Sequence, residues 1–119
     1  MAETLYERLG GEKGISAIVR DTLDHHLKNP LINARYQDKD REKLHRLSVE
    51  FFSMGTGGPA KYTGRDMRET HKGMNISEQE FIAVIDDILE ALDKNKIPQE
   101  TKNEVLGILY SMKGEIVRI

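Results

Sequence analysis

Hydrophobic residues recur at intervals of three and four along most of the chain, which is the spacing of one face of an α-helix. These stripes predict four substantial helices, which begin near Glu12, Asp40, Ser77 and Pro98. No segment shows the sustained alternation of hydrophobic and polar residues that is typical of a half-buried β-strand. The four predicted faces are Ile15, Ile18, Val19, Thr22, Leu23, His26 and Leu27; Leu44, Leu47, Ser48, Phe51 and Met54; Phe81, Val84, Ile85, Ile88, Leu89 and Leu92; and Val105, Ile108, Leu109, Met112 and Ile116.

Short-range signals mark the helix ends. Thr4 with Glu7, and Ser77 with Glu80, have the spacing of a capping box, so a short helix is also expected at the start of the chain. Residues 55–64, GTGGPAKYTG, contain four glycines and a proline and are expected to form a loop. The chain of 119 residues therefore predicts one all-α domain, residues 1–119, built from antiparallel helix pairs.

Composition and charge exclude several classes of function. A net charge of −2 gives no basic field for nucleic acid, and no hydrophobic run approaches the length of about 18 residues that spans a membrane. The chain has no cysteine, which excludes disulfides, thiolate metal sites and a cysteine nucleophile. Because the first residues do not resemble a signal peptide, we expect a cytoplasmic protein.

One histidine lies within a predicted hydrophobic face. In residues 64–77, GRDMRETHKGMNIS, helical spacing would place Met67, Thr70, His71 and Met74 together. His71 could be a core residue that bonds a backbone carbonyl, or a metal or cofactor ligand, since neutral imidazole is a common ligand. Isolated zinc is disfavoured because it needs several protein ligands, whereas haem iron needs only one proximal histidine in a hydrophobic pocket.

The residues alone leave three readings open. These are a haem pocket, a pocket for another apolar ligand, and a helical interaction domain without a cofactor. The glycine-rich loop lacks the strand and the GK[ST] ending of a phosphate-binding loop. Asp86 and Asp87 are adjacent on a predicted helix and are expected on its solvated surface, and of His25 and His26 one is expected to be exposed and one partly buried.

Three segments resemble group I truncated haemoglobins, the small two-over-two helical globins. They are LYERLGG at residues 5–11, VEFFSMGTGGPAKYTGRDMRETHKGMNI at 49–76, and KIPQETKNEVLGIL at 96–109. The double glycines and the M-x-x-x-H spacing carry the likeness, which covers nearly the whole chain. The resemblance implies a two-over-two helical sandwich that binds haem b non-covalently, with His71 as the proximal iron ligand. By position in the family, the surroundings of the haem would be Met67, Ile76, Phe81, Val84, Phe51, Phe52, Leu44, Leu47, Tyr36, Leu109 and Ile116.

On the distal side the chain departs from the family pattern. Leu23 stands where many members have tyrosine, Ser48 where many have glutamine, and Tyr36 where many have phenylalanine. The resemblance thus leaves Tyr36 as the expected hydrogen-bond donor to bound oxygen, with help from Ser48, beside the hydrophobic Leu23. His45 is expected either to face solvent or to serve as a sixth iron ligand after a rotation of its helix.

The family resemblance implies reversible binding of O2, NO or CO. It also suggests NO dioxygenation, which would require an external reductase. The alternative is a haem-based gas or redox sensor with an internal sixth ligand. No nucleic-acid or membrane partner is expected, and a monomer is the expected state.

Overall fold

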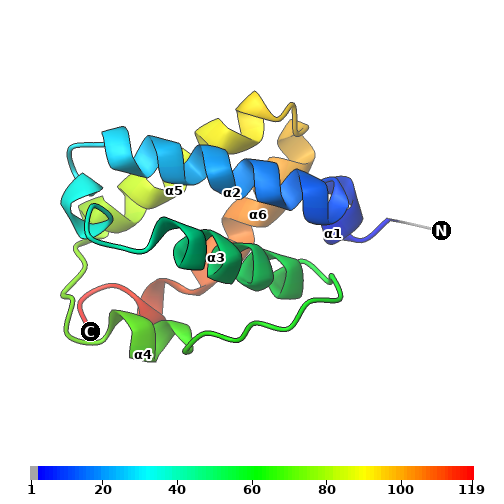
Figure 1. Ribbon diagram of the computed structural model, residues 1–119. Helices are drawn as coiled ribbons and strands as arrows, with labels where there is room; N and C mark the ends of the chain where they lie inside the picture. The colour runs from blue at the N-terminus through cyan, green and yellow to red at the C-terminus, as the bar shows by residue number, and fades with distance from the viewer. Residues whose placement is uncertain (1–2) are drawn as a thin grey trace.

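The computed structural model describes residues 3–119, and nearly all of its regular structure is helical (Figure 1). The only β-pairing among these residues is an isolated parallel bridge between Ile76 and Val117. The helices are α1 Leu5–Arg8, α2 Gly11–Lys28, α3 Arg41–Gly55, α4 Met67–His71, α5 Glu78–Lys94 and α6 Gln99–Ser111, with short 3-10 helices η1 Asn33–Arg35 and η2 Lys113–Glu115.

The four long helices form two stacked pairs. Helix α2 contacts α3, α5 contacts α6, and α2 also contacts α5, which joins the pairs. Figure 1 shows α2 and α3 running side by side, with α6 crossing behind them. The predicted two-over-two helical sandwich is therefore confirmed. The left-handed backbone of Gly10, at φ 97°, allows the chain to turn from α1 into α2.

The hydrophobic core lies where α2, α5 and α6 meet. Its buried side chains come mainly from the predicted stripes, and burial of each large one contributes about 1.5–3 kcal/mol to folding. The capping boxes at Thr4 and Ser77 are both present, and Asp40 caps α3 by accepting a bond from the Lys43 amide at 3.2 Å. The core consists of Leu9, Ile15, Ile18, Val19, Leu23, Ile76, Phe81, Ile85, Ile88, Ala91, Leu92, Val105 and Leu109.

Two of the predicted helical faces include residues that lie beyond the end of the helix in the structure. Helix α4 ends at His71, and Gly73 adopts a left-handed φ of 84°, so Met74 does not share a helical face with His71. Helix α6 ends at Ser111, and Ile116 follows η2 instead of continuing the stripe. In both places the chain bends back to pair Ile76 with Val117, so a tertiary contact replaces another turn of helix.

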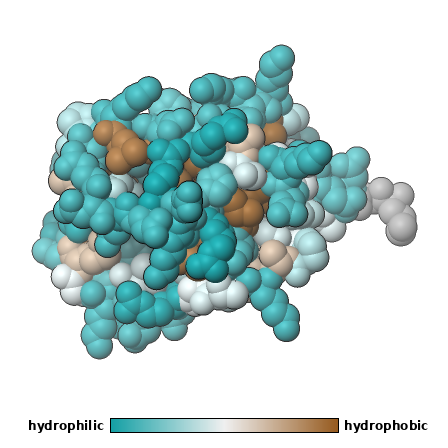
Figure 2. Space-filling model, in the orientation of Figure 1, coloured by the Kyte–Doolittle hydropathy of each residue, from teal (hydrophilic) through white to brown (hydrophobic). Residues whose placement is uncertain are grey.

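Two residues predicted to be buried are exposed. Leu27 and Met54, each near the end of its helix, lie on the surface because no neighbouring helix covers that last turn. In Figure 2 the visible face is mostly hydrophilic, and hydrophobic side chains appear in separate small areas. Within residues 3–119, no helix combines the length and hydrophobicity needed to cross a bilayer.

Candidate functional site

His71 lies in the last turn of α4, where local bonds fix its ring. Asp66 caps the helix by accepting a hydrogen bond from the Glu69 amide at 2.8 Å. The His71 Nδ1–H donates to the Met67 carbonyl oxygen at 2.7 Å, one helical turn back. In a neutral imidazole this bond puts the proton on Nδ1 and leaves the Nε2 lone pair free. The half-buried ring is therefore prepared to act as a metal ligand.

The segment after α4 is held by the C-terminal residues. The Gly73 amide donates to the Ile119 carbonyl at 3.2 Å, and the Arg118 amide donates to the Ile76 carbonyl at 2.9 Å. Helix α4 also contacts η2, and Figure 1 shows the red C-terminal segment beside it. These contacts fix the position of the short helix that carries His71.

Arg35 ties this segment to η1. Its guanidinium binds both carboxylate oxygens of Glu80 and donates to the Met74 carbonyl at 3.2 Å. The hydrogen bonds from Arg35, together with those from Ser77 and the Arg35 charge, lower the pKa of Glu80 to about 2. Arg35 directly precedes Tyr36, so these bonds connect the neighbour of Tyr36 to the backbone at Met74, just beyond His71.

Helix α3 presents a hydrophobic face that is only partly covered. It buries only Ser53 along Arg41–Gly55, whereas α5 buries seven side chains over a similar length. Leu44, Leu47, Phe51 and Phe52 are all half-buried. A hydrophobic helical face normally packs against another element, so this face has the character of a pocket wall.

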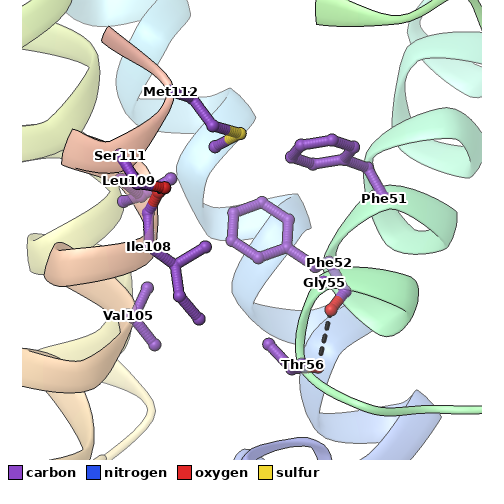
Figure 3. Close-up of a pocket in the computed structure, with 9 residues that line it drawn as sticks. All are labelled: Phe51, Phe52, Gly55, Thr56, Val105, Ile108, Leu109, Ser111 and Met112. Atoms are coloured by element: carbon purple, nitrogen blue, oxygen red, sulfur yellow. Dashed lines mark hydrogen bonds between the residues drawn. The ribbon is translucent and has the colours of Figure 1, made fainter.

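A cavity of about 230 Å³ opens along part of this face. Figure 3 shows Phe51 and Phe52 of α3 pointing toward the side chains of α6 and its C-cap, Met112. This volume is below the range of about 300–1,000 Å³ usual for small-molecule sites, so it forms only part of a pocket for a large flat ligand. Its lining is Phe51, Phe52, Gly55, Thr56, Val105, Ile108, Leu109, Ser111 and Met112.

The structure divides the predicted haem-contacting residues into two groups. Leu23, Ile76, Phe81 and Leu109 belong to the hydrophobic core, and of these Leu109 also reaches the cavity. The others are half-buried and retain accessible surface, and they are Tyr36, Leu44, Leu47, Ser48, Phe51, Phe52, Met67, Val84 and Ile116.

Tyr36 follows η1 directly, and its ring stacks on the buried imidazole of His26. The two ring centroids are 4.7 Å apart with an interplanar angle of 28°. Burial raises the pKa of Tyr36 to about 12, assisted by the negative charge of Asp87. The hydroxyl therefore keeps its proton at neutral pH. Within residues 3–119, no hydrogen-bond acceptor takes that proton, so the hydroxyl is available as a donor to a ligand.

His45 lies toward α2 and away from the lining of that cavity. Its Nε2 is 3.0 Å from Ser16 Oγ, and its ring lines a separate groove with Tyr6 and Ser53. Burial and the nearby arginines Arg41 and Arg20 lower the pKa of His45. A role as sixth ligand would require this hydrogen bond to break.

The prediction that Asp87 lies on the solvated surface is wrong. Asp87 is 5% exposed, and His26, expected to be at most partly buried, is 4% exposed. The His26 Nδ1–H donates to Asp87 Oδ2 at 2.7 Å, and the Asn29 side-chain amide also donates to this carboxylate. Both residues lie on the inner side of their helices, where α2 crosses α5. The presence of His26 in the hydrophobic stripe of α2 was the one sequence signal for this pair.

The helical sandwich, the short helix that carries His71 and the partly uncovered hydrophobic face of α3 are features of a globin. The profile of the bacterial-like globin family matches residues 4–118, and the chain belongs to this family. Its relatives place it among the group 1 truncated haemoglobins, as the sequence resemblance predicted.

Two curated relatives and one solved structure illustrate the similarity. The group 1 truncated haemoglobin GlbN of Mycolicibacterium paratuberculosis is 29% identical over 95% of this chain and 83% of its own length. The Synechocystis sp. GlbN is 31% identical over 88% of both chains. The Fe(III) form of the Tetrahymena pyriformis truncated haemoglobin superposes with a TM-score of 0.95 at 26% identity, covering 98% of this chain and 100% of the other.

Proposed function

We propose that this protein binds haem b non-covalently through His71 Nε2 and reversibly binds a diatomic gas on the opposite face of the haem. The bond from His71 Nδ1 to the Met67 carbonyl carries the proposal, because it directs the lone pair of the ring to Nε2. The half-buried hydrophobic face of α3 supports it, since a porphyrin would cover such a surface.

The chemistry of the residues fits haem and not an isolated metal ion. A porphyrin supplies its own equatorial nitrogen ligands, so one imidazole from the protein is sufficient. No histidine lies between His71 and Ile119, which supports non-covalent attachment of the haem.

The residues expected on the distal side favour a gas that becomes negatively polarised when it is coordinated. When bound, haem iron supplies reversible coordination of O2, NO or CO. Tyr36 is protonated and free to donate, and the family resemblance would put the hydrophobic Leu23, Leu44 and Leu47 on the same side of the haem. O2 gains more from a donor than CO does, because it acquires more negative charge when coordinated. This difference favours O2 as the ligand that the pocket would stabilise.

Two further predictions are narrower. The family resemblance predicts NO dioxygenation with an external reductase. That the protein is cytoplasmic and monomeric also stays a prediction. The sensor alternative relies on His45 as an internal ligand, and the bond of His45 to Ser16 gives that alternative less support than Tyr36 gives to gas binding.

An optical spectrum of the purified protein, reconstituted with haemin, tests the proposal. A Soret band that shifts reversibly with O2 and CO in the ferrous state is expected. Extraction of all haem into acid–acetone is expected if attachment is non-covalent. A protein that takes up no haem would exclude this function, and a ferrous low-spin spectrum without added ligand would support the sensor alternative.

A further inference from the structure

The buried His26–Asp87 pair has no part in haem ligation by His71. The two residues are 61 positions apart in sequence and join α2 to α5. Asp87 also accepts from the Asn29 amide, at 3.2 Å to Oδ1 and 3.3 Å to Oδ2. The carboxylate therefore has donors from two residues, and the imidazole has one fixed orientation. Such a pair holds a side chain rigidly, because breaking it would leave a buried charge without a partner.

The fixed imidazole forms one wall for the Tyr36 ring. With the centroids 4.7 Å apart and the planes 28° from parallel, the two rings are in stacking contact. Tyr36 itself follows a three-residue 3-10 helix in the connection between α2 and α3, which gives its side chain little local support. The stack on His26 restrains the plane of the Tyr36 ring, and with it the position of the hydroxyl.

We infer that His26, anchored by Asp87, is the positioning residue for the Tyr36 hydroxyl that would donate to O2. This inference rests on the proposed function for the role of the hydroxyl, while the contacts themselves are present in the protein without ligand. It assigns a ligand-tuning role to a pair that is not among the residues lining the cavity between α3 and α6.

The charges around the pair favour a neutral imidazole. Burial lowers the pKa of His26 despite the opposing effect of Asp87, and the neighbouring His25 lowers it further. Beyond the pair, His25 lies 3.2 Å from Glu90, and Arg35 is neutralised by Glu80 beside Tyr36. A neutral ring donates from Nδ1 alone, so it keeps one tautomer and one orientation.

A double-mutant cycle on the haem-reconstituted protein separates positioning from general structural damage. His26→Gln can keep a donor to Asp87 while it removes the stacked ring, and Asp87→Asn loosens the anchor. Each variant is expected to raise the O2 dissociation rate by about three- to ten-fold, which lies within the range of couplings measured between residues in contact. CO dissociation is expected to change by less than about two-fold, since CO gains little from the donor.

The same substitutions are then made in Tyr36→Phe. If His26 acts through the hydroxyl, neither one changes O2 release further in that background. An equal effect in both backgrounds would overturn the inference, because it would mean that His26 affects the pocket by another route. His25→Ala serves as the control, since His25 is adjacent in sequence but does not stack on Tyr36.

A second readout does not depend on gas binding. In protein labelled with ¹³C-tyrosine, the Tyr36 ring resonance, assigned by its loss in Tyr36→Phe, is expected to shift in His26→Gln and stay unchanged in His25→Ala. An unchanged resonance would refute the stacking role even if O2 binds. A shifted resonance in a protein that binds no O2 would instead overturn the ligand-tuning role along with the gas-binding proposal, and leave only the stack.

Discussion

The proximal and distal sides of the proposed site are built by different means. On the proximal side, His71 bonds to a carbonyl four residues before it, within one short helix. On the distal side, Tyr36 is placed by a ring from α2, which is itself held by a carboxylate from α5. The proposed iron ligand is thus oriented by local backbone geometry, and the proposed donor to bound gas by contacts between distant parts of the chain.

Under the proposed function, this difference separates haem binding, which needs His71, from the adjustment of gas affinity, which would depend on Tyr36. A ligand fixed by local bonds keeps its orientation wherever its short helix is placed. A donor fixed by tertiary contacts changes whenever one of several residues changes. The distal side is also where this chain departs from the pattern of its family, at Leu23, Tyr36 and Ser48.

The largest expected effect tests the proximal side. His71→Ala should abolish stable haem binding, because no other described imidazole in the chain is placed to replace it. The measurement is the Soret absorbance after removal of free haemin. His25→Ala, which alters a half-buried histidine paired with Glu90, should retain haem. Recovery of binding with added imidazole would sharpen the assignment, and undiminished haem retention in His71→Ala would refute it.

A second pair of variants compares a core residue with a pocket residue. Phe81→Ala should lower the free energy of unfolding by about 3–5 kcal/mol, because Phe81 is 5% exposed and packs in the core. Phe51→Ala should cost less than about 1 kcal/mol in the haem-free protein, since a half-buried ring loses little area burial.

Urea unfolding measures both stabilities, and haem transfer to an acceptor globin measures retention. Phe51→Ala should release haem faster than the parent despite its small effect on folding. A large loss of stability in the haem-free Phe51 variant would show that the α3 face belongs to the core instead of the pocket.

Arg35 connects the segment that carries Tyr36 with the segment after His71, so its removal should affect both sides of the proposed site. Arg35→Met loses two bonds to Glu80 and one to Met74, which should cost about 1–2 kcal/mol after solvent screening. Arg41→Met is the matched control, because Arg41 pairs with Asp24 on the surface and should cost less than about 1 kcal/mol.

The Arg35 effect should depend on pH. Because the pKa of Glu80 is lowered from 4.5 to about 2 in the folded protein, its stabilisation is fully present above pH 4.5 and is lost as the pH falls toward 2. Parent and Arg35→Met should therefore converge in stability in acid. Chemical unfolding at pH 7, 4 and 3 measures this, and a constant difference would indicate that the bond to the Met74 carbonyl dominates.

The last variant tests the distal donor, through a ligand rate and not through stability. Tyr36→Phe should raise the O2 dissociation rate by about ten-fold or more, from the loss of about 1.5–3 kcal/mol of a hydrogen bond to a charged acceptor. CO dissociation should change far less. Stopped-flow ligand replacement measures both rates, and equal O2 rates in variant and parent would leave Ser48 as the remaining polar candidate of the distal side.

The sequence predicted the helices well because their signals are local. The capping boxes at Thr4 and Ser77 and the three-and-four spacing act within a few residues, and both form as expected. Local spacing also singled out His71 within the M-x-x-x-H segment, but only the family resemblance made it the proposed iron ligand. Helix ends were less predictable, because α4 and α6 stop where the chain turns to pair Ile76 with Val117.

The family resemblance identified more of the site than the residue pattern could. The pattern left a haem pocket, another ligand pocket and a cofactor-free domain equally open. In the sequence, nothing distinguishes the hydrophobic residues of α3 from those of a buried core face; they are Leu44, Leu47, Phe51 and Phe52. Only the fold shows that α3 leaves this face half-buried, because burial depends on which helix packs opposite.

The sequence by itself determined the helical architecture and the residue proposed to hold the iron, since both depend on neighbours within one or two helical turns. Tertiary structure alone decided the surroundings of Tyr36. The sequence predicted Asp87 on the solvated surface beside Asp86. In the structure it is buried, because α2 crosses α5 at His26. A carboxylate is stable there only with donors from His26 and Asn29, and no spacing along the chain could show that these three would meet.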